Sequence, residues 1–137
     1  MRRAALRIAV VALAGAAMAP APASARPVDP APSRLQVQGV EYQLLLSRQK
    51  LRPGDAIVQF VNAGEDSHNL RLQRVDSSGA PLGPELGLGE VEPGAYENLA
   101  AHLHRGSTYE LWCSVKDHRA KGMDATLRTK RHRHRHR

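Results

Sequence analysis

Short stretches in which hydrophobic and polar residues alternate recur between residues 35 and 129, and no long helical pattern interrupts them. In residues 35–47 the alternation changes phase once, and Gly39 stands at the change, where we expect a bulge. The other strands are expected at residues 56–62, 68–75, 109–115 and 123–129. This pattern predicts an all-β fold, either an antiparallel sandwich or a barrel.

Turn-forming residues separate the expected strands. Their positions predict turns at residues 52–55, 76–79 and 105–107 and a loop at residues 63–67. Glycine and proline are so frequent in residues 79–94 that we expect this stretch to be the least regular part of the domain.

Three residues with metal-binding side chains fall on the inward faces of these strands. His68, Cys113 and Met123 each stand two residues from hydrophobic neighbours, and residues two apart share a face of a strand. His68 and Met123 begin their strands, whereas Cys113 lies late in its own. Antiparallel neighbours would therefore gather the three at one end of the sandwich, and His118 belongs to the loop that closes this end.

These four residue types favour a single copper ion. Cys113, His118 and Met123 are spaced at equal intervals of four intervening residues, and a soft thiolate, two imidazoles and a weak thioether are the donors of mononuclear blue-copper sites. Cys113 is the one cysteine of the chain, so it has no internal disulfide partner. The alternatives are a surface position for His68 and a simple packing role for Cys113 or Met123.

Residues 34–129 resemble the cupredoxins, the plastocyanin and azurin family. The resemblance rests on the pair His68-Asn69, on the run Tyr-Glu-Leu-Trp-Cys at residues 109–113, and on the Cys-x4-His-x4-Met loop that follows. It implies a cupredoxin-like antiparallel Greek-key β-sandwich that binds one copper ion.

The resemblance also implies a role for each residue of the site. The strong copper ligands would be His68, Cys113 and His118, and the long axial contact would be Met123. Asn69 would join the two ligand loops through hydrogen bonds. His118 would lie exposed, as the edge through which electrons enter and leave.

The ends of the chain differ in composition from this domain. Residues 1–25 have the basic start, the short apolar core and the Ala-x-Ala end of a signal peptide, which predicts a periplasmic or secreted protein, by the Sec or the Tat route. The apolar run of 12 residues is shorter than the roughly 20 that a membrane-spanning helix needs. We expect a Pro-rich arm at residues 26–33, and an Arg/His-rich disordered tail at residues 130–137.

The formal charge of +7 comes from the two ends. Residues 26–127 carry 11 basic and 13 acidic side chains, so the domain lacks the excess of basic residues that a nucleic-acid-binding surface needs. The 112 residues that follow the predicted signal are enough for one domain, and we expect a monomer.

We interpret the chain as an exported carrier of single electrons and not as an enzyme. Copper oxidases and nitrite reductases of similar fold pass electrons through a histidine next to the cysteine, whereas Cys113 is flanked by Trp112 and Ser114. A binuclear copper centre needs two cysteines. The alternative function is a copper-binding chaperone or scavenger without redox turnover.

Charged and histidine-rich stretches add two weaker predictions. Lys116, Arg119 and Lys121 near His118 predict a positive rim that would steer a redox partner with an acidic docking surface. The tail is interpreted as solvated, with copper capture or adhesion to an anionic partner as alternatives. His102 and His104 would share one face of an extended segment, where an auxiliary metal site is a minor alternative.

Overall fold

The computed structural model describes residues 28–131, and this part of the chain folds into nine β-strands without a helix. The predicted signal peptide and residues 132–137 of the tail lie outside the described residues. No helix in the described range is long and apolar enough to cross a membrane.

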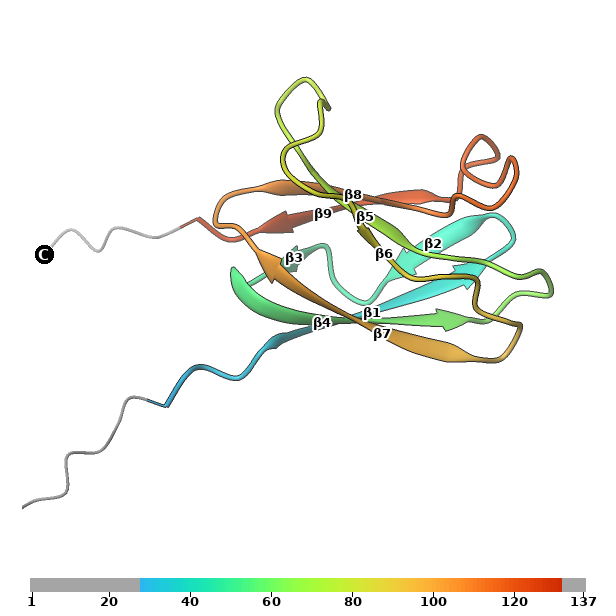
Figure 1. Cartoon of the computed structure of the whole chain (residues 1–137), viewed down its shortest axis with the longest axis horizontal. Helices are drawn as coiled ribbons and strands as arrows, with labels where there is room; N and C mark the ends of the chain where they lie inside the picture. Colours follow the sequence, from blue (N-terminus) through green and yellow to red (C-terminus); the bar gives the residue numbers. More distant parts are fainter. Residues whose placement is uncertain (1–27, 132–137) are drawn as a thin grey trace, which may run out of the picture.

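The strands form two sheets packed face to face (Figure 1). The first sheet has the order β2-β1-β4-β7 and consists of β1 (Ser33–Val40), β2 (Gln43–Leu46), β4 (Gly54–Asn62) and β7 (Tyr96–Leu103). The second has the order β3-β9-β8-β5-β6 and consists of β3 (Lys50–Leu51), β9 (Asp124–Thr129), β8 (Thr108–Trp112), β5 (Arg71–Val75) and β6 (Leu86–Gly87). The predicted all-β sandwich is confirmed.

The pairing is mixed and not antiparallel throughout. β1 pairs with β4 in parallel, and so does β3 with β9, while the remaining neighbours are antiparallel. Between β1 and β4 the chain runs through β2 in one sheet and β3 in the other. This crossover returns the chain beside β1 in the same direction.

The phase change in residues 35–47 is a hairpin and not a bulge. β1 and β2 are antiparallel, with Gly39 opposite Leu44 and Val40 opposite Gln43. The turn between them shifts the inward positions by one residue. Gly39 itself stays in regular pairing. It packs closely against the core, as a Cβ atom at this position would lie only 2.8 Å from Cζ of Phe60.

The strands that sequence reasoning missed lack a readable alternation. β7 is exposed at both faces over its first half, so a period of two appears only in its second half. β3 and β6 have only two residues each. The expected strand at 68–75 also begins later than predicted, because His68 forms one isolated bridge to Val91 before β5 starts at Arg71.

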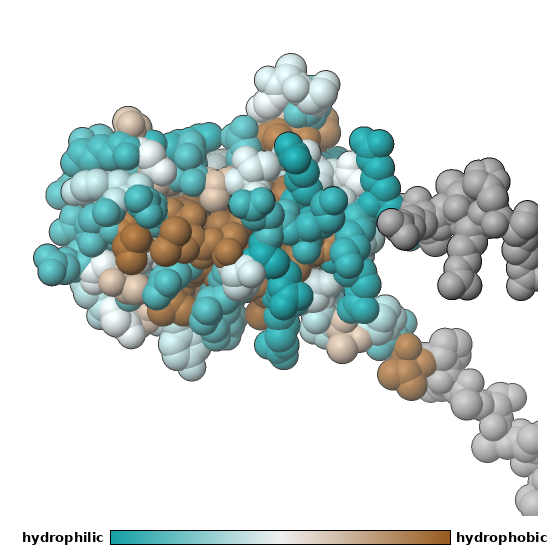
Figure 2. All heavy atoms as spheres, turned by 180° about the vertical axis from the view of Figure 1, so that it is seen from behind, coloured by the Kyte–Doolittle hydropathy of each residue, from teal (hydrophilic) through white to brown (hydrophobic). Residues whose placement is uncertain are grey.

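Hydrophobic side chains from both sheets fill the space between the layers. Val58 and Phe60 of β4 are 0% exposed, and Leu111 of β8 and Leu127 of β9 meet them from the other sheet with the same value. The sandwich is less covered where β2 approaches β9. Apolar side chains gather on the face shown in Figure 2, and a groove between these two strands is lined partly by Leu45 and Ala125.

Four connections lie at one end of the sandwich, on the right in Figure 1. They are the β1–β2 turn, the β4–β5 connection, the β6–β7 connection and the loop 113–123 between β8 and β9. β9 ends at the opposite end, on the left in Figure 1. The four residues predicted to hold the copper ion therefore belong to one end of the fold.

Gly39→Ala should lower the free energy of unfolding by about 1–3 kcal/mol, because the added methyl group would press on Phe60 and on Met123, whose Cε atom lies 3.1 Å from the Cβ position. Gly89→Ala is the matched control: Gly89 has open space around its Cβ position, and its variant should stay within about 0.5 kcal/mol of the wild type. Urea unfolding of both variants measures the difference, and equal stabilities would contradict the close packing at Gly39.

Candidate metal centre

The loop between β8 and β9 folds back on itself through main-chain hydrogen bonds. The β8–β9 ladder ends with Trp112 opposite Asp124, so Cys113 and Met123 face each other just beyond it. The Cys113 amide donates to the Met123 carbonyl at 3.1 Å, and the Met123 amide donates to the His118 carbonyl at 3.1 Å. These bonds hold all three residues at the base of the loop.

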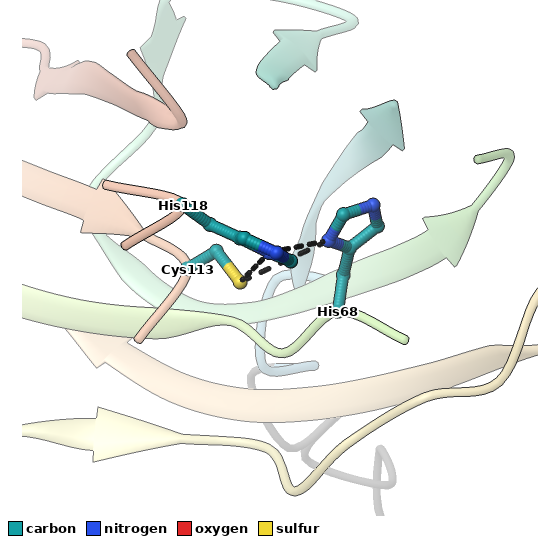
Figure 3. A group of neighbouring side chains, drawn as sticks. All are labelled: His68, Cys113 and His118. Atoms are coloured by element: carbon teal, nitrogen blue, oxygen red, sulfur yellow. Dashed lines mark hydrogen bonds between the residues drawn. The ribbon is translucent and has the colours of Figure 1, made fainter. Parts of the chain in front are cut away.

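His68, Cys113 and His118 bring one sulfur and two ring nitrogens together (Figure 3). The His68 Nδ1 atom lies 3.1 Å from His118 Nδ1, and Cys113 Sγ lies 3.6 Å from His118 Nδ1 and 4.0 Å from His68 Nδ1. All three residues are buried, with exposed fractions of 0%, 0% and 4%.

The donor set fits copper. A thiolate and two imidazole nitrogens within 4.8 Å of one another suit a borderline-soft ion that accepts both sulfur and nitrogen ligands. Among the described residues this is the one group of three or more such donors. The cluster is therefore consistent with one copper site.

Met123 is fully buried at the same end of the fold. Its main chain contacts Cys113 and His118 as described, and its Cε atom reaches towards Gly39 on the opposite sheet. The side chain thus runs between the two sheets. Its role as an axial ligand stays a prediction.

Asn69 joins the two loops that carry the cluster. Its Oδ1 atom accepts a hydrogen bond from the Ser114 amide at 2.7 Å, and its Nδ2 donates to Ser114 Oγ at 2.9 Å. Ser114 directly follows Cys113, and Asn69 directly follows His68. These two hydrogen bonds therefore fix the relative position of His68 and Cys113, which are 45 residues apart in the chain.

The expectation that His118 is exposed is wrong, since only 4% of the residue is accessible. The Tyr42 ring packs on the imidazole, with centroids 4.9 Å apart and planes inclined by 58°. Lys121 covers Tyr42 in turn, with Nζ 4.4 Å from the ring centroid. A surface cavity of about 450 Å³, lined in part by Asn69 and Lys116, still reaches His118.

Two of the three cations in the predicted positive rim have acidic partners. Arg119 lies 3.0 Å from Glu110 and stacks over the Trp112 ring at 4.3 Å, and Lys121 pairs with Asp117 at 3.3 Å. These contacts lower the net positive charge that a docking partner would meet around the loop.

Sequence reasoning missed Glu41, which lies in the turn between β1 and β2. Its Oε1 atom is 2.9 Å from His68 Nε2 and accepts hydrogen bonds from the Glu65 and Asp66 amides at 2.8 Å each. The bond from Asp66 is the main cause that lowers the pKa of Glu41 to about 2. Interpreting residues 35–47 as a hairpin would have placed this carboxylate at the correct end of the sandwich.

His102 and His104 lie apart from this centre, at the end of β7 and just beyond it. Their rings are 6.0 Å apart between centroids, and His102 Nδ1 lies 2.8 Å from Asp55 Oδ1. The pair shares one face, as predicted. It does not belong to the one three-donor cluster found in the described residues, and the auxiliary site gains no support.

Comparisons with known proteins agree on the fold. No family model matches the sequence, and neither does any curated protein. Among solved structures, a dithionite-reduced auracyanin from the photosynthetic bacterium Roseiflexus castenholzii is 15% identical, with a TM-score of 0.57 over 73% of this chain and 98% of the other. Auracyanin B is 17% identical, with a TM-score of 0.56 over 74% and 92%. A multicopper oxidase is 18% identical, with a TM-score of 0.50 over 70% of this chain and 41% of its own. The chain has a cupredoxin-like fold.

Asn69→Ala should lower the free energy of unfolding of the metal-free protein by about 1–3 kcal/mol, because it leaves the Ser114 amide without its side-chain acceptor. Asn98→Ala, at an exposed position of β7, should stay within about 0.5 kcal/mol of the wild type. Thermal or urea unfolding measures both changes. Indistinguishable variants would show that the bridge between the loops contributes nothing to stability.

Proposed function

We propose that this protein carries single electrons through one copper ion held by His68, Cys113 and His118, with Met123 as the axial ligand. The observation that supports this most is the convergence of one cysteine sulfur and two imidazole nitrogens in a buried position at the end of the sandwich. We further propose that the protein is exported and works outside the cytoplasm.

Bound copper would supply a one-electron couple between Cu(II) and Cu(I). The Cys113 thiolate and the Met123 thioether are soft donors that favour the reduced ion, whereas the imidazoles of His68 and His118 suit both states. The surrounding core excludes water from the donors, which also affects the potential.

Hydrogen bonds already hold the loops that carry the proposed ligands in the metal-free protein. Cys113 is tied to Met123 through the main chain and to the His68 loop through Asn69 and Ser114. Ligands held in this way should change their positions little between Cu(II) and Cu(I). Small rearrangement favours rapid electron exchange over tight capture, and this supports a carrier rather than a scavenger.

The neighbours of Cys113 argue against catalysis. Ser114 bonds to Asn69, and the Trp112 ring lies under the Arg119 guanidinium, so neither flanking residue provides an imidazole through which electrons could leave. Electrons would instead leave on the side of His118, where the Tyr42 ring covers the imidazole and a surface cavity reaches it. We propose that a redox partner docks there, with Lys116 as the cation of this loop available to an acidic surface.

Cys113→Ser should abolish the intense blue thiolate-to-copper absorption that we expect on addition of one equivalent of Cu(II). Serine preserves the size of the side chain and removes the soft donor. An optical titration measures the band, and circular dichroism checks that the sandwich still folds. A variant that stays blue would contradict thiolate ligation.

Met123→Leu should keep the blue colour and raise the reduction potential, because the loss of a weak axial donor destabilises Cu(II) more than Cu(I). Redox titration against a mediator of known potential measures the shift. An unchanged potential, with the colour retained, would count against axial ligation.

Electron-exchange kinetics separate the carrier from the copper chaperone. A carrier should be reduced and reoxidised repeatedly in stopped-flow mixing, with one electron per copper and no release of metal. Slow reduction, or loss of copper in each cycle, would favour the chaperone or scavenger.

A further inference from the structure

We infer that Glu41 is a positioning residue for His68: its carboxylate fixes which ring nitrogen faces the metal and lowers the reduction potential of the centre. This inference rests on the proposed copper function. Glu41 does not belong to the three-donor cluster, since it contacts His68 from the far side of the ring.

The two nitrogens of the His68 ring have different surroundings. Nδ1 lies 3.1 Å from His118 Nδ1 and 4.0 Å from Cys113 Sγ, so it faces the centre. Nε2 lies 2.9 Å from the Glu41 carboxylate. A carboxylate only accepts hydrogen bonds, so Nε2 carries the hydrogen of the neutral ring, and Nδ1 keeps the lone pair that a metal needs.

The carboxylate is held in a cradle built by the loop after β4. A single oxygen, Oε1, receives the amides of Glu65 and Asp66 as well as His68 Nε2. Gly64 lies directly against the carboxyl group, and a Cβ atom there would overlap it, at 2.7 Å from both Cδ and Oε2. The loop therefore fits the Glu41 side chain and leaves no room for a larger residue at position 64.

Asn62 fixes this loop from below. It is fully buried, its Oδ1 accepts from the Gly64 amide at 3.0 Å, and its Nδ2 donates to the carbonyls of Asp66 and Val91 at 2.8 and 2.7 Å. A continuous set of hydrogen bonds thus runs from the end of β4 through the loop to Glu41 and on to His68. The carboxylate has little freedom to leave the imidazole.

A fixed negative charge behind a ligand affects the metal as well as the ring. The His68 side chain is 0% exposed and that of Glu41 is 27% exposed, so solvent screens their interaction only in part. Negative charge stabilises the more positive oxidation state, Cu(II). A hydrogen bond from Nε2–H to a carboxylate also makes Nδ1 a stronger electron-pair donor to the metal. Both effects lower the reduction potential.

Glu41→Gln tests the charge separately from the structure. The Gln Oε1 atom can accept the same three hydrogen bonds, so the fold and the blue band should persist. Losing the charge should shift the copper equilibrium towards Cu(I) by about tenfold, equal to about 59 mV for a one-electron couple. The control is Asp29→Asn, an exposed acid-to-amide change before the start of β1, which should not shift the potential. A Glu41→Gln variant with the wild-type potential would overturn the electrostatic part of the inference.

A metal-free measurement tests the tautomer and does not depend on the proposed function. Long-range ¹H–¹⁵N NMR of the apoprotein should show His68 with its hydrogen on Nε2, and Glu41→Leu should lose this preference. A second variant, Gly64→Ala, should displace the carboxylate and weaken the preference in the same direction. The opposite tautomer in the wild type, or no change in either variant, would overturn the positioning role. Failure of the wild type to turn blue with Cu(II) would instead reject the proposed function and leave the tautomer result standing.

Discussion

The candidate site depends on the point where the β8–β9 ladder ends. Trp112 and Asp124 form the last pair, and the next residues, Cys113 and Met123, remain joined by a main-chain hydrogen bond of 3.1 Å. The loop between them starts and ends at this hydrogen-bonded pair. Within it, the His118 carbonyl accepts a hydrogen bond from the Met123 amide. One ladder end thus places a cysteine, a histidine and a methionine together without any contribution from a metal.

The fourth residue of the candidate site, His68, comes from another loop and is held by separate hydrogen bonds. His68 lies just before β5, outside regular pairing except for its bridge to Val91. Asn69 ties this segment to Ser114 on the cysteine side, and Glu41 holds the ring from the opposite side. Buried polar groups are costly unless they are hydrogen-bonded, so the network both satisfies these groups and restricts their movement. Restricted movement of these side chains is the property that the proposed electron-transfer centre would require.

Sequence reasoning could locate residues whose position follows from strand periodicity. His68, Cys113 and Met123 were placed on inward faces at one end because side chains alternate along strands, and the structure has all three buried there. Burial of His118 could not be predicted in this way, since it depends on Tyr42 from a hairpin that is distant in sequence. Glu41 was missed for the same reason: its contact with His68 spans 27 residues and depends on how two connections meet. The parallel pairs escaped prediction because alternation reveals the face of a strand and not its direction.

The central claim is that one sulfur and two imidazole nitrogens bind a single copper ion at this end of the sandwich. X-ray absorption at the copper edge tests it most directly, on the full chain loaded with one equivalent of Cu(II). The account predicts that each copper ion has one short copper–sulfur contact and two copper–nitrogen contacts of imidazole type. A first shell made only of nitrogen and oxygen donors, without the short sulfur contact, would contradict it.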